Sequence, residues 1–217
     1  MIKNLNLRYK KHFGDKSYII SVFVGLFLLV LSFVVNFYAG TYATENVSNS
    51  VKDIILSNIP VFDVDVIFVY GPFVLWLFVM ALFLYDPKKI PFIFKSVALF
   101  IIIRSVFITL THIGPFPDQV PLDLNPANWF NKFSFGGDLF FSAHTGLPYL
   151  MSLVFWDNKL LRSIFILTAI FFGIIVLLGH LHYSIDVISA FFITYAIYHI
   201  AEIFFKKDKL LFDQETI

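Results

Sequence analysis

Six long apolar stretches constrain the fold of this chain more than any other feature of its sequence. A bilayer core about 30 Å thick requires about 20 mostly apolar residues to cross it as a helix. Stretches of that length cover residues 17–39, 64–85, 90–112, 138–157, 161–181 and 183–205. Hydrophobic residues make up 59% of the chain and charged residues only 14%, which excludes a disordered protein. The sequence therefore predicts an all-α integral membrane protein, with residues 1–217 forming a single bundle of six transmembrane helices.

The distribution of basic residues predicts the orientation of this bundle. Thirteen of the sixteen Lys and Arg residues lie in the amino-terminal segment, near the turns after the second and fourth stretches, and in the carboxyl-terminal tail. Because cytoplasmic loops carry an excess of Lys and Arg, both termini are expected to be cytoplasmic. Two long loops, about 40–63 and 113–137, are then expected to face outward. Short loops and the absence of a targeting extension favour a bacterial inner membrane, with any outer site facing the periplasm or exterior.

Ionisable residues in the apolar stretches gather near the predicted outer surface. Asp138 and His144 lie at the start of the fourth stretch, and His180 and His182 lie where the fifth ends and the sixth begins. Arg104 lies about 10 Å below the outer end of the third stretch, at 1.5 Å per residue. Ionisable groups are costly inside a membrane and usually mark functional sites. The sequence therefore predicts a polar site at the depth of the lipid headgroups.

The spacing of these residues indicates a chemistry. His182 and Asp186 are four residues apart and are expected on one face of a helix. The carboxylate can accept the proton of one ring nitrogen and leave the other nitrogen as a nucleophile or base. Arg104 offers a planar fork that suits a phosphate, and Asp138 fits a helix amino-terminal cap. Two histidines, an orienting acid and a buried Arg suggest phosphoryl transfer through a covalent phosphohistidine.

Two segments, GDLFFSAHT at 137–145 and HLHYSIDVISAFFIT at 180–194, resemble the sphingomyelin synthase branch of the type-2 phosphatidic acid phosphatase superfamily. That branch carries Gly-Asp, three residues, then Ser-Gly-His-Thr, and later His-Tyr-Thr/Ser-x-Asp-Val. Residues 104–111 are similar to its third-helix motif. The family has six helices and cytoplasmic termini, so the resemblance implies the same layout as the apolar stretches. It covers residues 100–200.

The chain departs from the pattern of this branch at several positions. Ala143 and Gly136 replace a Gly and a Cys of the branch, and its first loop motif is reduced to a remnant around Asp53. Val176 stands where the phosphatase branch has an Arg. The missing Arg favours the transferase branch over the phosphatase branch.

The resemblance implies a role for each motif residue. His182 attacks phosphorus, Asp186 orients His182, and His144 protonates the departing lipid alcohol and then deprotonates the acceptor. The residues expected to bind the phosphate or the substrate are Arg104, Asp138, Ser142, His180 and Tyr183. The predicted activity moves a phospho-headgroup from a membrane glycerophospholipid to ceramide or diacylglycerol. No metal, other cofactor or nucleic acid is expected to take part.

Three alternatives stay open from the sequence. The same site with water as the acceptor would make the protein a lipid phosphate phosphatase. His144, His180 and His182 can supply three nitrogen ligands to zinc and leave a fourth position for water, as in a zinc-dependent lipid hydrolase. The polar cluster can also be the headgroup site of a non-catalytic lipid carrier, although no discontinuous helix pair or inverted repeat is visible.

Overall fold

The part of the chain that the structure describes is all-helical. The computed structural model describes residue 9, residues 12–119 and residues 136–213. Its helices are, in chain order, α2 (Lys16–Glu45), α3 (Asp65–Tyr85), α4 (Ile90–Leu110), α5 (Ala143–Val154), α6 (Lys159–Leu178), α7 (Ser184–Phe204) and α8 (Lys206–Asp213). Two short 3-10 helices, η1 (Leu56–Asn58) and η2 (Pro87–Lys89), precede α3 and α4. Much of the predicted second outer loop and of the basic amino-terminal segment lies outside the described residues.

Five of these helices are long and apolar enough to cross a bilayer. They are α2, α3, α4 together with η2, α6 and α7. On α2, which extends six residues beyond its predicted end, Phe23, Phe27 and Val30 are each more than half exposed. Large apolar faces of this kind are expected where a helix meets lipid. The described helices therefore support a multi-pass integral membrane protein.

The fourth predicted span differs from the expectation. α5 begins at Ala143 and has only 12 residues, so it is about 18 Å long and too short to cross a bilayer alone. Ser142 is its amino-terminal cap and accepts the backbone N–H of Thr145 at 3.4 Å. The prediction that Asp138 lies in the first turn or caps this helix is wrong, because Asp138 precedes α5 in an irregular segment bound by Arg104.

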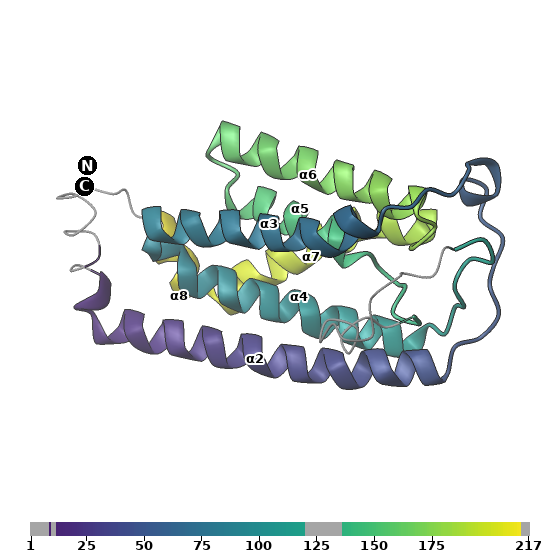
Figure 1. Ribbon diagram of the computed structural model, residues 1–217. Coiled ribbons are helices and arrows are strands. Elements are labelled where there is room, and N and C mark those ends of the chain that lie inside the picture. Colours follow the sequence, from purple (N-terminus) through teal and green to yellow (C-terminus); the bar gives the residue numbers. More distant parts are fainter. Residues whose placement is uncertain (1–8, 10–11, 120–135, 214–217) are drawn as a thin grey trace.

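The helices run alongside one another, with the two described chain ends at the same end of the bundle (Figure 1). α2 lies along α4, and a Cβ at Gly25 would lie 3.1 Å from the Cβ of Phe94. At the terminal end, Lys95 Nζ lies 2.6 Å from both Asp208 Oδ2 and Ser21 Oγ. This cluster ties α8 to α4 and α2. The loops that follow α2 and α4 lie at the opposite end (Figure 1).

α5 packs against α6 and α7 and also contacts α4. A Cβ at Gly146 would lie 2.6 Å from the ring of Phe100 on α4 and 2.8 Å from Thr194 Oγ1 on α7. Gly173 lets α6 approach α7 closely in the same way, because a Cβ at Gly173 would lie 3.0 Å from the side chain of Val187. This close packing brings the first turn of α5 beside the first turn of α7 at the loop end of the bundle.

Candidate active site

The start of α7 holds the closest pair of predicted catalytic residues. His182 Nδ1 lies 3.5 Å from Asp186 Oδ2, and both side chains are buried. The contact is within ion-pair distance but lacks hydrogen-bond geometry, and Nδ1 has no hydrogen-bond partner among the described residues. The two residues do not share a helical face as predicted, because His182 precedes Tyr183, the amino-terminal cap of α7. The Asp186 carboxylate, in the first turn of α7, instead points toward His182 just before the helix begins.

Asp186 also holds the backbone around the site. Its Oδ2 accepts the backbone N–H of Tyr183 at 2.9 Å, and its carbonyl oxygen accepts the backbone N–H of Ser142 at 3.1 Å. Its second carboxylate oxygen, Oδ1, is buried and has no hydrogen-bond partner in the part of the chain that the structure describes. One residue therefore caps α7, faces His182 and joins the start of α7 to the start of α5.

His144, the second residue of α5, is held by α3. Its Nε2 lies 3.1 Å from the carbonyl oxygen of Phe68, and its ring stacks on the Phe68 ring with centroids 4.1 Å apart. The ring of Phe172 meets it edge-on from α6. Because a carbonyl oxygen only accepts, Nε2 must carry a hydrogen. Arg104 on α4 binds the Phe141 carbonyl just before α5, and the Ser142 N–H binds the Asp186 carbonyl on α7, so the structure brings together the start of α5, α4 and the start of α7.

Arg104 binds the segment that leads into α5. Its Nε donates to the Phe141 carbonyl at 2.8 Å, and its two terminal nitrogens donate to the side chain (3.1 Å) and the carbonyl of Asp138. On the other side of this segment, Gly137 donates its N–H to Thr44 Oγ1 at 3.2 Å. Arg104, which was predicted to bind phosphate, thus uses these three hydrogen bonds to hold the backbone ahead of Ser142 in place.

Tyr183 and His180 are buried beside the loops that follow α2 and α4. The Tyr183 hydroxyl donates to the Gly114 carbonyl at 2.7 Å and accepts the Val51 N–H at 3.2 Å, so it joins both loops to the start of α7. His180 has a φ of 52°, in the left-handed region. Both of its ring nitrogens are buried, and neither has a hydrogen-bond partner within residues 12–119 and 136–213. The ring of Phe116 meets it edge-on. Tyr183 thus has loop residues as its hydrogen-bond partners, whereas His180 keeps unused hydrogen-bonding capacity.

Asp53 also contributes to the site, and the sequence did not predict this contribution. Its Oδ2 accepts the backbone N–H and the hydroxyl of Ser184 at 2.7 and 2.8 Å. Its Oδ1 accepts the backbone N–H groups of Ile55 and Leu56. Burial raises the pKa of Asp53, but these four hydrogen bonds outweigh burial and hold the pKa below its usual value. The remnant of the first loop motif was the only sequence signal that pointed to this position.

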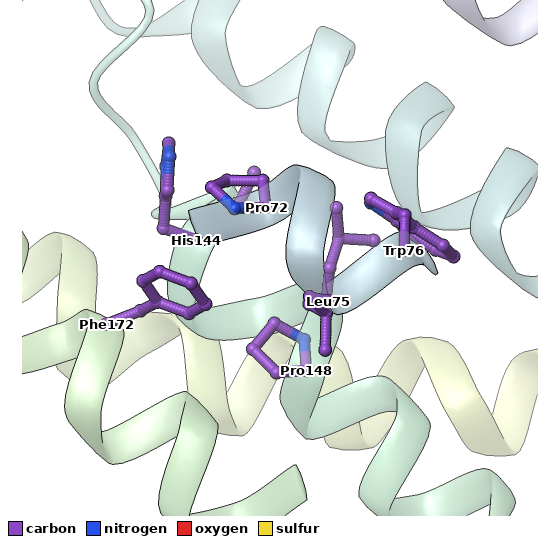
Figure 2. A pocket seen from close by; sticks show the side chains of 8 residues that line it. Pro72, Leu75, Trp76, His144, Pro148 and Phe172 are labelled. Atoms are coloured by element: carbon purple, nitrogen blue, oxygen red, sulfur yellow. The ribbon is translucent and has the colours of Figure 1, made fainter. Parts of the chain in front are cut away.

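An apolar groove ends at His144. It lies between α3, α5 and α6, and its lining comprises Pro72, Leu75, Trp76, Ala143, His144, Leu147, Pro148 and Phe172. Figure 2 shows His144 at one end of the groove and Trp76 at the other. His144 is the only ionisable residue in this lining. A hydrocarbon chain is therefore the kind of group that the groove suits.

The three histidines named as zinc ligands do not form a metal site. Over residues 12–119 and 136–213, no group of three or more His, Cys, Asp or Glu side chains is arranged to hold a metal ion. His144 faces the Phe68 carbonyl, and His182 faces Asp186. The geometry of these side chains thus gives no support to the zinc-dependent alternative.

Comparisons with known proteins point to one superfamily. Residues 136–203 match the family model of the PAP2 superfamily C-terminal domain. The match covers just under a third of the chain and includes His144, His182 and Asp186 but not Arg104. It supports the type-2 phosphatidic acid phosphatase superfamily, whose members are generally lipid phosphatases. The comparisons with curated proteins and with solved structures found no match.

Proposed function

We propose that the protein is a membrane lipid phosphotransferase that works through a phosphohistidine on His182. The observation that carries this proposal is the buried pair in which His182 Nδ1 lies 3.5 Å from Asp186 Oδ2. The nearby carboxylate favours a hydrogen on Nδ1, which leaves the lone pair of the other ring nitrogen, Nε2, free to attack. The negative charge of Asp186 then stabilises the positive charge that develops on the ring.

The first half of the reaction forms the covalent intermediate. Nε2 of His182 bonds to phosphorus, the bond between phosphorus and the glycerolipid oxygen breaks, and that oxygen takes a proton from His144. In the second half, His144 removes a proton from the acceptor hydroxyl, the acceptor oxygen bonds to phosphorus, and the bond to His182 breaks. The hydrogen bond from the Ser142 N–H to the Asp186 carbonyl oxygen, which joins the start of α5 to the start of α7, supports the action of the two imidazoles on one phosphoryl group.

Phosphate binding is assigned to the start of α5 and its neighbours. A helix amino terminus attracts anions through its free N–H groups and its dipole. Arg104 uses three of its five N–H groups on Asp138 and Phe141, which leaves two for a phosphate oxygen. Ser142, as the cap of α5, and His180, with two unpartnered nitrogens, are proposed to line this site. For Tyr183 we propose an indirect role, because both loops bind its hydroxyl.

A lipid substrate is supported by the groove that ends at His144. Eight residues line it, and the only charged or titratable one is His144. A hydrocarbon chain lying in this groove would bring its ester phosphate to the catalytic end. The acceptor is proposed to be a lipid alcohol, ceramide or diacylglycerol, as in the sphingomyelin synthase branch. With water in its place, the same two steps would make the protein a lipid phosphate phosphatase.

We also propose that the site faces the outer side of a bacterial inner membrane. α8, which holds the described part of the basic tail, lies at the end of the bundle opposite the loops that follow α2 and α4 (Figure 1). The excess of Lys and Arg at the tail end favours the cytoplasm for that end. The candidate site would then act on outer-leaflet lipids.

The test uses purified protein in mixed micelles with phosphatidylcholine, phosphatidylethanolamine or phosphatidic acid as donor and ceramide or diacylglycerol as acceptor. Mass spectrometry of the products is expected to reveal a new phospho-headgroup lipid with the native protein and none with His182→Ala. The matched control is His199→Ala, because His199 lies on an exposed face of α7 and pairs with Glu202. Diacylglycerol with free phosphate would indicate the phosphatase, and full activity of His182→Ala would refute the proposal.

A further inference from the structure

A proline in the middle of α3 bears directly on His144. In an α-helix, the N–H of residue i donates to the carbonyl of residue i−4. Pro72 lies inside α3, and proline has no N–H to donate. The carbonyl four residues earlier belongs to Phe68, so this carbonyl lacks its usual helical partner. It is the same carbonyl that lies 3.1 Å from His144 Nε2.

Residue 68 therefore holds the imidazole in two independent ways. Its carbonyl oxygen fixes which ring nitrogen carries the hydrogen, and its ring stacks on the imidazole at a 21° interplanar angle. A carbonyl cannot donate, so Nε2 keeps its hydrogen whether the imidazole is neutral or charged. Only Nδ1 is left to gain and lose a proton.

From this geometry we infer that Pro72 is a positioning residue for proton transfer by His144. Pro72 leaves the Phe68 carbonyl open, the carbonyl holds Nε2–H, and Nδ1 becomes the atom that exchanges protons with the substrate oxygen. A residue with an N–H at position 72 would give the Phe68 carbonyl its usual helical partner. The N–H of residue 72 and the Nε2–H of His144 would then compete for that carbonyl. The inference rests on the proposed acid–base role of His144, whereas the state of the imidazole nitrogens can be measured without any substrate.

The first experiment reads the imidazole directly. Nitrogen-15 NMR of protein labelled at histidine distinguishes a ring nitrogen that carries hydrogen from one that does not, and loss of a signal in His144→Gln assigns His144. Native protein, at a pH where His144 is neutral, is expected to carry the hydrogen on Nε2. Pro72→Ala is expected to give a mixture of both tautomers. Hydrogen on Nδ1 in the native protein would overturn the inference, even if Pro72→Ala did not fold.

The second experiment separates positioning from helix shape. Ala is a far better helix former than Pro, so Pro72→Ala is expected to keep or raise the Tm in detergent. It is nevertheless expected to lower kcat about tenfold, a part of what a well-placed acid–base group contributes. This kcat is measured at saturating substrate, because Pro72 also lines the apolar groove and its replacement can change KM. Pro60→Ala, in an exposed loop, is the control and should change neither the Tm nor kcat.

The outcomes distinguish this inference from the proposed function. If no lipid is turned over by native protein, the phosphotransferase proposal fails while the NMR result still decides the role of Pro72. If turnover is present and Pro72→Ala keeps native kcat and a single Nε2–H tautomer, the positioning role is refuted. A fall in Tm with an unchanged tautomer would mean that Pro72 only shapes α3, and would also refute it.

Discussion

Ser142 donates its backbone N–H to the carbonyl oxygen of Asp186 across 3.1 Å, and this bond joins the two motif segments of the chain. Ser142 caps α5, which carries His144 two residues later. Asp186 lies in the first turn of α7 and faces His182. A single hydrogen bond between helix starts thus sets the spacing of the candidate acid–base and nucleophilic histidines.

Removing the charge of Asp186 should affect chemistry far more than folding. Asp186→Asn can still accept the Tyr183 N–H through its amide oxygen, so the Tm in detergent should change little. It cannot stabilise a charged His182, so kcat should fall about 100- to 10,000-fold, the range expected for an acid–base group. Glu202→Gln, a carboxylate on the same helix that pairs with His199, is the matched control. Equal losses in both variants would contradict the prediction.

A substitution of Arg104 should lower the thermal stability more than a substitution of Asp138, its partner in the ion pair. Arg104→Lys cannot span Asp138 and Phe141 together, and each hydrogen bond that it loses from a charged group costs about 1.5–3 kcal/mol. Asp138→Asn alters only one of the three bonds and leaves both backbone contacts in place. Thermal unfolding in detergent is therefore expected to give a larger drop in Tm for Arg104→Lys. A larger drop for Asp138→Asn would mean that the ion pair dominates.

Asp53 should make stability depend on pH at the acid end. The pKa of Asp53 is lowered in the folded protein, whereas an unfolded Asp titrates near about 3.9. A lowered folded pKa gives stability that is fully present above the unfolded pKa and is lost as pH falls through the folded pKa. The Tm of the native protein should therefore fall on acidification below about pH 4 more steeply than that of Asp53→Asn.

At neutral pH the same variant should already be less stable. An Asn NH2 group directed at Ser184 cannot accept the Ser184 N–H, so that hydrogen bond would be lost, at about 1–3 kcal/mol for a buried group left unpaired. Identical acid slopes for native protein and Asp53→Asn would show that other carboxyl groups carry the pH dependence.

Filling the apolar groove should discriminate between long and short acyl chains. Leu147→Trp places a larger side chain in the lining of the groove, three residues after His144 on α5. Each methylene withdrawn from the groove costs about 0.8 kcal/mol, roughly fourfold in affinity. KM for long-chain substrates should therefore rise steeply while that for short-chain analogues stays within about twofold. An equal change for both chain lengths would place the hydrocarbon elsewhere.

The buried ion pair at the terminal end should be sensitive to loss of one partner. Within the described residues, Asp208→Ala leaves the buried Lys95 ammonium with Ser21 as its remaining hydrogen-bond partner. Breaking such a pair costs about 3–5 kcal/mol, whereas replacing both partners by apolar residues is often tolerated. Denaturation in detergent should therefore rank the double variant Lys95→Met with Asp208→Leu above Asp208→Ala. The reverse ranking would contradict a structural role for the pair.

Much of the helical framework is predictable from the sequence because apolar length is a local property. Five of the predicted stretches correspond to helices long and apolar enough to span a bilayer. The prediction that the fourth stretch is helical from residue 138 was wrong, because Asp138 and Phe141 bind Arg104 through side-chain and backbone contacts. An isolated apolar stretch does not reveal that a distant Arg binds its backbone. The fourth helix consequently starts at Ala143.

The sequence alone determined the apolar helices and which ionisable residues lie near their ends, since both follow from residue type and spacing along the chain. Only the tertiary structure decided how those residues are held. Asp53 reaches Ser184 across 131 positions, and Phe68 reaches His144 across 76. Such hydrogen bonds depend on distance and direction in space, which packing of the helices sets and which no local pattern encodes.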